Sequence, residues 1–248
     1  MTSPRVGLDR NLRLAWLDAA AVVAGRGLRG SELQTALMTA LENELPGTGH
    51  NSARGKTVTV LKRVWCTVPE PTRDLRDRAL SKLTEGDADY RLALHWAMLL
   101  ASYPFFGDLA EVVGRLLTLQ GSFDRVHVVR RISDRWGDRS TIPKAVRRIL
   151  TSMVEWGALV LKDGQFTAAL TRRVVSPDHA ALLVEAALLA SPGHTASVSA
   201  LVVSPMLFPF NVTAGAEQLR HSERFRVHRE GLDVEVLTLA VPQFVLRS

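Results

Sequence analysis

Apolar residues recur at steps of three or four through the first 120 residues, with turn residues between the runs. This spacing predicts amphipathic α-helices. The longest apolar coverage falls within residues 87–103, where apolar side chains lie on nearly all sides of the predicted helix. Such a helix is typical of the buried centre of a bundle. The predicted helices span residues 8–25, 31–41, 53–66, 72–83, 87–103 and 109–121. We therefore expect an all-helical bundle over residues 1–120.

The pattern changes between Ser122 and Ser176. Two amphipathic helices are predicted there, separated by Gly137. Residues 123–136 form the first, whose apolar face would carry Phe123 and Val126. The second runs from Thr141 to Trp156, and a hairpin with the strong turn signal Asp163-Gly164 follows it. Helix, turn, basic helix and hairpin in this order are typical of a winged helix-turn-helix, which we assign to residues 121–176.

Residues 177–248 are predicted to form a C-terminal α+β module. A helix to Ala190 is followed by a break, a short apolar segment, a short helix over residues 213–221, and a hairpin around Glu230-Gly231. The order resembles that of the preceding segment, and the sequence leaves open whether the module is a degenerate second winged helix. The fold class predicted for the whole chain is mainly α with small β-hairpins.

Positive charge is concentrated in the winged segment. The chain has 31 Lys and Arg against 25 Asp and Glu, a net charge of +6. Residues 122–176 hold 11 of the cations and 5 of the acids, so they carry that whole excess, while the other residues balance. A basic excess confined to one segment favours a polyanionic partner, and double-stranded DNA is the partner that a winged helix predicts.

The candidate DNA-binding residues are mainly cations of this segment. The second helix would offer its outer face to the major groove, the hairpin would reach a minor groove or phosphates, and the preceding helix would contact phosphates. An ordinary solvated helix face is the alternative. The candidates are Lys144, Arg147, Arg148 and Thr151 on the second helix, Lys162, Arg172 and Arg173 on or after the hairpin, and Arg130, Arg131, Arg135 and Arg139 before it.

Two further basic clusters extend the list of candidates. Arg54, Lys56, Lys62 and Arg63 lie on the predicted helix 53–66 and would continue a DNA path across the bundle. An exposed cationic helix face explains them equally well. In the tail, Arg224, Arg226 and His228 alternate on one face of a predicted strand. They would form a cationic edge in which Arg226 contacts DNA, or they would guard an exposed strand against aggregation.

No motif of the sequence predicts an enzyme. Residues 25–30 match GxGxxG but follow a helix rather than a strand, and Gly55-Lys56-Thr57 lacks the first glycine that a phosphate-binding loop needs. The single Cys66 cannot form a disulfide, and the seven histidines have no metal-ligand spacing. We therefore expect no catalytic activity, metal or cofactor. With no signal core or membrane span in the sequence, a cytoplasmic protein is predicted.

The order of these features resembles the BrxA family of the BREX phage-defence systems. The resemblance covers roughly residues 8–175 in helix order and includes the basic stretch from Ala53 to Val58, the apolar helix of Leu92 to Leu100, and the winged segment. The tail after Ser176 has no counterpart in it. The resemblance implies a non-enzymatic DNA-binding component of a multi-protein antiviral system, in contact with other defence proteins.

The leading prediction is thus a DNA-binding winged-helix protein without catalytic activity, whose binding depends steeply on salt. A protein–protein interaction scaffold and a transcriptional regulator are the alternatives. The first would use the bundle to dock a partner.

Overall fold

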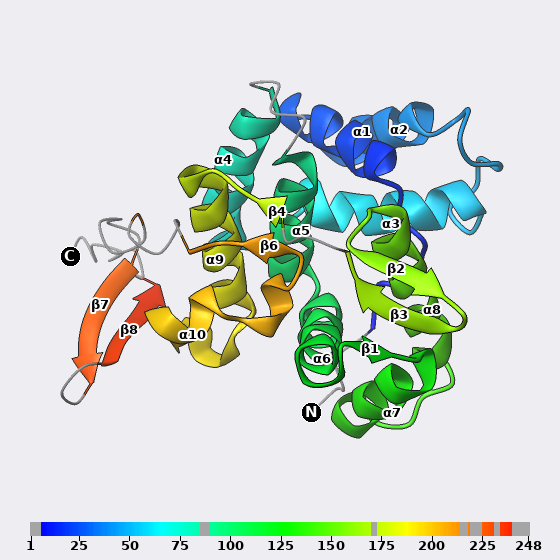
Figure 1. Ribbon diagram of the computed structural model, residues 1–248. Helices are drawn as coiled ribbons and strands as arrows, with labels where there is room; N and C mark the ends of the chain where they lie inside the picture. The colour runs from blue at the N-terminus through cyan, green and yellow to red at the C-terminus, as the bar shows by residue number, and fades with distance from the viewer. Residues whose placement is uncertain are drawn as a thin grey trace, which may run out of the picture.

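The computed structural model describes residues 6–84, 90–169, 173–213, 218, 225–230 and 234–239. These residues are mainly helical, with small sheets (Figure 1). The helices are α1 (Leu14–Gly25), α2 (Gly30–Ala40), α3 (Ala53–Trp65), α4 (Arg73–Thr84), α5 (Arg91–Ser102), α6 (Pro104–Gln120), α7 (Arg125–Trp136), α8 (Ile142–Glu155), α9 (Pro177–Ala190) and α10 (Val198–Val202), with short 3-10 helices at Glu70–Thr72, Pro192–His194 and Pro205–Leu207. The strands are β1 (Ser122–Phe123), β2 (Leu159–Lys162), β3 (Gln165–Ala168), β4 (Arg173–Val174), β5 (Thr195–Ser197), β6 (Phe210–Asn211), β7 (Phe225–Glu230) and β8 (Val234–Leu239).

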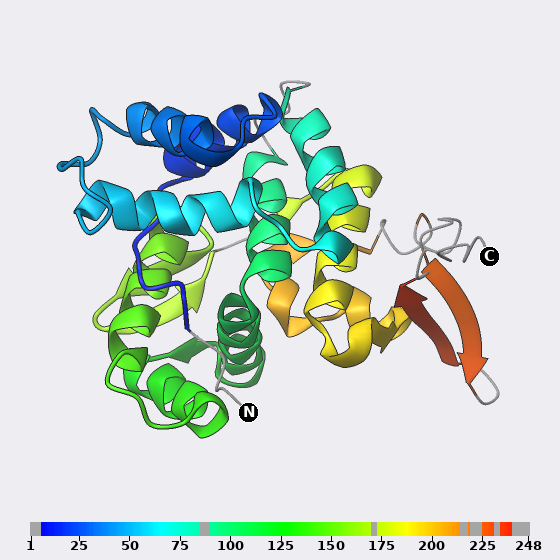
Figure 2. The ribbon, with the colours of Figure 1, turned by 180° about the vertical axis from the view of Figure 1, so that it is seen from behind.

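Helix α5 lies at the centre of the molecule, as its all-round apolar pattern predicts. Every residue from Leu92 to Leu100 is buried. Helix α9 packs along α5, and both views of the ribbon show it on the far side of α5 from α7 and α8 (Figures 1 and 2). The indole N–H of Trp96 donates to the carbonyl of Met206, 2.9 Å away, so the 3-10 helix Pro205–Leu207 is bonded to this centre.

One continuous hydrophobic core joins the three predicted segments. Its buried residues run from Val6 to Leu237, and each helix from α1 to α10 contributes some of them. Helix α6 touches the 3-10 helix at Pro205–Leu207 so closely that a Cβ on Gly114 would lie 2.1 Å from the carbonyl oxygen of Pro205. The predicted boundaries at residues 120 and 176 therefore fall within packed structure.

Three small sheets complete the fold. The first has the strand order β1-β3-β2 and is antiparallel. Strands β4 and β6 form a parallel pair. The third sheet has the order β5-β8-β7, again antiparallel. Mainly helical structure with small hairpins confirms the predicted fold class at this level.

Three predicted helix starts are wrong, and one of them is that of α6, which begins at Pro104 instead of at residue 109. Residues 8–13 are not helical: Leu8 and Leu12 are buried, but in an extended segment that precedes α1. Phe123 lies in β1 rather than in a helix, because Asp124 caps α7 by accepting a hydrogen bond from the backbone N–H of His127. Val126 is consequently 70% exposed, and Val128 takes its place in the core.

Other predictions agree with the structure or lie outside it. The hairpin turn at Asp163-Gly164 is confirmed, with φ angles of 51° and 78°. The helix predicted over 213–221 and the turn after Glu230 fall largely outside the described residues. Among the helices that the structure describes, none combines the length and apolarity needed to cross a membrane. A cytoplasmic location stays a prediction.

Candidate nucleic-acid interface

Helix α8 presents one apolar face to the core and one polar face to solvent. Thr141 and Pro143 begin the helix, the proline at a position where its missing N–H costs nothing. Its outer face exposes Lys144, Arg147 and Thr151, as the sequence predicts. The buried face comprises Ile142, Ala145, Val146, Ile149, Leu150, Ser152 and Met153.

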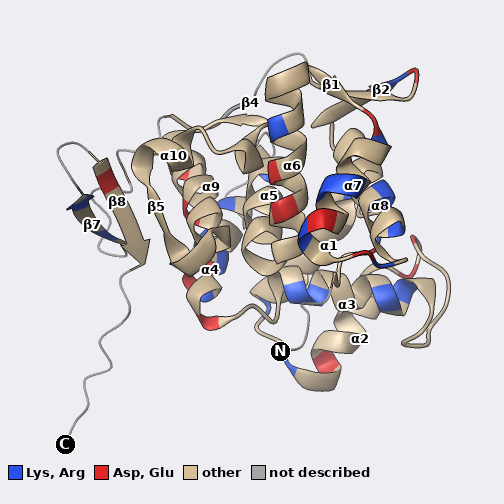
Figure 3. Ribbon diagram, turned by 90° about the horizontal axis from the view of Figure 1, so that it is seen from below, with Lys and Arg blue, Asp and Glu red and all other residues tan. Residues whose placement is uncertain are grey.

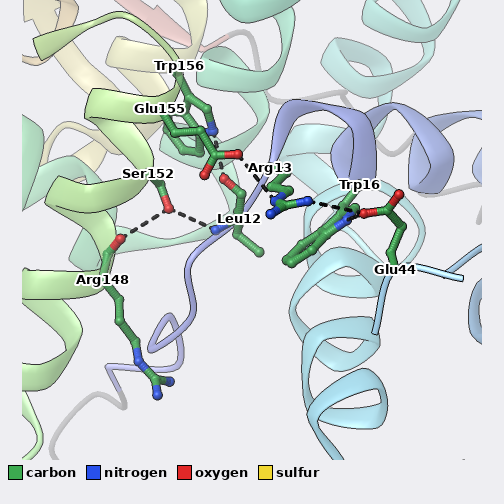
Figure 4. Close-up of polar contacts among 8 residues, drawn as sticks. All are labelled: Leu12, Arg13, Trp16, Glu44, Arg148, Ser152, Glu155 and Trp156. Carbon is green, nitrogen blue, oxygen red and sulfur yellow. Dashed lines mark hydrogen bonds and ion pairs between the residues drawn. The ribbon is translucent and has the colours of Figure 1, made fainter. Parts of the chain in front are cut away.

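One flank of α8 is covered by the extended segment 8–13, which we call the N-terminal strap (Figure 4). The backbone N–H of Leu12 donates to Ser152 Oγ at 2.8 Å. The carbonyl of the same residue accepts from the indole N–H of Trp156, also at 2.8 Å. Both groups of Leu12 are thus satisfied by side chains of α8 and its C-cap, in a region closed to water.

The strap also occupies Arg148. This side chain donates from Nη1 to the carbonyl of Asp9 and lies 4.0 Å from its carboxylate, with 22% of the side chain exposed. The prediction that Arg148 shares the open face with Arg147 is therefore wrong. Consecutive helical residues point about 100° apart, so Arg147 and Arg148 cannot both lie at the middle of the polar face of α8.

Arg13, at the end of the strap, joins α8 to the helical bundle. Its guanidinium lies 3.4 Å from Glu155 of α8 and 3.3 Å from Glu44, which follows α2. The indole N–H of Trp16 donates to the same carboxylate oxygen of Glu44 at 3.2 Å. The position of α8 is thereby tied to that of α1 and α2, although the residues are far apart in sequence.

Helix α7 keeps some of its predicted cations exposed and commits another. Arg130 and Arg131 are exposed on its outer face, and Arg139, after its end, is half-buried. Arg135 pairs with Asp108 at 2.9 Å and with Glu111 at 2.6 Å. The hydrogen bond with Glu111 is the main cause of a raised pKa of Arg135, so this cation serves to hold α7 on α6 rather than to meet phosphate.

The β2–β3 hairpin projects beside α8. Lys162 is exposed next to the turn, opposite Gln165. Val160 is 47% exposed and Leu161 is 51% exposed, so the hairpin also offers apolar surface. Arg172 lies outside the described residues, and the backbone of Arg173 pairs with that of Phe210 in the β4–β6 ladder.

The basic helix α3 divides in the same way. Arg54 donates to the carbonyls of Leu45 and Glu42 at 2.8 and 3.1 Å and so fixes the loop before α3. Arg63 donates to the carbonyl of Ser102 at 3.1 Å and lies over the ring of Tyr103. Lys56 and Arg63 are exposed and Lys62 is half-buried, so Lys56 has the most open position of the α3 cations that form no bond to a carbonyl.

Figure 3 shows how the cations are distributed. Blue positions occur on α3, α7 and α8 at one end of the molecule, on β7 at the other, and on α4 between them. Arg226 and His228 are exposed on β7, and Arg224 lies outside the described residues. The exposed candidates therefore form a main group around α8 and a separate position on β7.

The structure also places three features that were considered as signs of catalysis or phosphate binding: Cys66, Gly55 and the GxGxxG stretch. Burial raises the pKa of the Cys66 thiol to about 11, which keeps it protonated at neutral pH. Gly55 lies in the first turn of α3 and is not part of an open phosphate-binding loop. Its N–H donates to Ser52 Oγ. The GxGxxG stretch joins α1 to α2 as a loop. No group of three or more potential metal ligands occurs among the described residues.

Sequence reasoning missed the strap and strand β1. Leu12 and Ser152 are separated by 140 positions, and a hydrogen bond at that separation leaves no periodic signal. A two-residue strand is likewise too short for a period-two pattern. The chain matches no protein-family model, no curated protein and no solved structure. The resemblance to the BrxA family and the defence partners that it implies stay predictions.

Proposed function

We propose that the chain is a winged-helix protein that binds double-stranded DNA, with α8 as the recognition helix and the β2–β3 hairpin as the wing. The observation that carries the proposal is the element order α6-β1-α7-α8-β2-β3 with the strand order β1-β3-β2. This order places a short strand between the first two helices and pairs it with the second strand of the hairpin. It adds α6 and β1 to the module expected from sequence.

The charge of the exposed groups supports the same partner. Lys144 and Arg147 lie on the outer face of α8, and Lys162 is exposed on the hairpin beside it. These three residues form no ion pair with any residue that the structure describes. Their charge is available to neutralise phosphates, while Arg130 and Arg131 of α7 flank the same helix pair.

The strap restricts which groups take part. Arg148 donates to the strap and so orients α8, and Thr151 donates its hydroxyl hydrogen to the carbonyl of Arg147 at 2.9 Å. The hydroxyl oxygen of Thr151 keeps its acceptor capacity toward solvent. We therefore assign direct contact to Lys144, Arg147 and Lys162 and a positioning role to Arg148.

Charge reversal at two of these contacts tests the proposal. Lys144→Glu with Arg147→Glu should lower the slope of log K against log salt by about 1.8, because each phosphate contact contributes about 0.9. Binding to a 30-bp duplex is measured by fluorescence anisotropy at several salt concentrations. Arg26→Glu with Arg29→Glu makes the same charge change on the exposed α1–α2 loop and should leave the slope nearly unchanged.

Circular dichroism and thermal unfolding establish that both double variants remain folded. Equal binding of the two variants would remove α8 from the interface. Failure of the unsubstituted protein to bind duplex at low salt would reject DNA as the partner.

A further inference from the structure

The sheet β5-β8-β7 repeats the connectivity of the sheet β1-β3-β2. In both, a short first strand pairs with the last strand of a hairpin, and that last strand pairs with the strand preceding it. The registers coincide as well. Ser122, Thr167 and Val160 form one row of the first sheet. Thr195, Thr238 and Arg226 form the corresponding row of the second.

The next rows extend the correspondence. Phe123, Phe166 and Leu161 match Ala196, Leu237 and Val227. In both rows the middle strand supplies a buried side chain, Phe166 or Leu237, and the outer strand an exposed one, Leu161 or Val227. One row further on, Lys162 follows Leu161 on β2 and His228 follows Val227 on β7, so Lys162 corresponds to His228.

The helices around the two sheets are arranged alike. Helix α6 precedes β1, and α9 precedes β5. Each first strand leads directly into a helix that begins with a side-chain cap. Asp124 accepts from the N–H of His127 at 2.9 Å, and Ser197 accepts from the N–H of Ala200 at 3.1 Å. The tail therefore shares strand pairing, register and helix entry with the proposed DNA-binding module.

The exposed face of the second hairpin has the chemistry of a phosphate contact. Arg226 and His228 alternate on β7 and are both exposed, and Thr195 is exposed in the row of Arg226. Neither Arg226 nor His228 forms an ion pair with a described residue. Phe225 and Leu237 lie on the opposite face of the hairpin and belong to the core. Val236, which pairs with His228, is buried as well, so on this face Arg226 and His228 of β7 are the side chains presented outward.

We propose that the β7–β8 hairpin is a second wing, in which Arg226 and His228 bind the phosphate backbone of double-stranded DNA. The inference rests on the proposed function, since it takes the partner from the first module. All three ribbon views place β7–β8 at the opposite end of the molecule from β2–β3 (Figures 1, 2 and 3). A duplex that contacts both wings must therefore span the molecule, so the proposal predicts that the second contact needs a long duplex.

Duplex length separates the two contacts. Arg226→Glu with His228→Glu is compared with the unsubstituted protein on a 12-bp and a 40-bp duplex at 0.1 M salt. The variant should bind the 12-bp duplex normally and the 40-bp duplex about tenfold more weakly, because one phosphate contact at this salt concentration is worth roughly eightfold. Arg226→Lys with His228→Lys keeps positive charge at both positions and should retain the 40-bp affinity.

Three other outcomes would reject the second wing, and one of them would also reject the proposed function. If the charge-reversed variant binds the 40-bp duplex as the unsubstituted protein does, the second wing is rejected and the α8 interface stands. An equal loss on both duplex lengths, with an unchanged circular dichroism spectrum, also rejects a separate contact. If the unsubstituted protein binds neither duplex, the proposed function and the second wing fail together.

Discussion

Removing the hydroxyl of Ser152 should detach the N-terminal strap from α8. Ser152→Ala leaves the buried N–H of Leu12 without its acceptor, 2.8 Å away in the unsubstituted protein. An unsatisfied buried donor costs about 1–3 kcal/mol. Thr151→Ala is a matched control, because both hydroxyls donate to the carbonyl four residues back, at 3.1 and 2.9 Å, but Thr151 is exposed and receives nothing from the strap.

Both substitutions gain about 0.5 kcal/mol of helix propensity, so that term cancels between them. The two variants should then differ by about 1–3 kcal/mol in unfolding free energy. For a chain of 248 residues this corresponds to roughly 2–6 °C in Tm, which calorimetry resolves. Hydrogen exchange of the Leu12 amide should also accelerate in Ser152→Ala alone. Equal Tm values for the two variants, together with unchanged exchange, would refute the strap as a structural contact.

Two other predictions concern the core. Gly114→Ala should destabilise the protein by about 1–3 kcal/mol or more, because its Cβ would lie 2.1 Å from the carbonyl oxygen of Pro205. Gly107→Ala on the same helix is the control: its Cβ would have its nearest neighbour at 3.6 Å, so this change should be neutral or stabilising. Equal urea midpoints for the two variants would contradict the close packing at Gly114. Burial lowers the pKa of His95 below its ordinary 6.5 despite its 2.8 Å bond to Asp18, so the unfolded chain binds more protons and stability should fall by about 1.4 kcal/mol per pH unit below 6.5. His95→Gln should remove that part of the pH dependence, and identical pH profiles of unfolding for both proteins would exclude it.

Local sequence signals predicted those parts of the candidate interface whose structure depends on neighbouring residues. The Asp163-Gly164 turn requires positive φ angles that few other residue pairs adopt easily, so the hairpin could be placed from sequence. The apolar stripe of α8 likewise fixed which side faces outward, and Lys144 and Arg147 are exposed as expected. In both cases the information lies within a few neighbouring residues.

Contacts between distant segments could not be predicted in this way. Leu8 and Leu12 have helical spacing, yet they lie in the extended strap, because the polar groups of Leu12 bond to α8 instead of to neighbouring turns. Both leucines could be buried in a helix or in an extended segment, so hydrophobic spacing alone could not distinguish the two conformations. Arg148 was misassigned for the same reason, since its partner Asp9 is 139 positions away.

Several candidate arginines bond to backbone carbonyls, which their side-chain chemistry favours, whereas Arg130, Arg131 and Arg147 are exposed. Arginine is weakly hydrated and has several fixed donors, so it can satisfy backbone carbonyls at loop ends at little desolvation cost. Arg54, Arg63 and Arg148 each do so. Lysine is a strongly hydrated point charge, and Lys56 and Lys144 remain exposed.

A carbonyl-bound arginine keeps its charge but no longer directs all of its donors outward. It therefore adds to the long-range potential that attracts a polyanion without making the close contacts that hold it. Substituting Arg148 would consequently disturb the strap as well as the charge. This is why Lys144 and Arg147, and not the adjacent arginine pair, provide the cleaner test of α8 as a recognition helix.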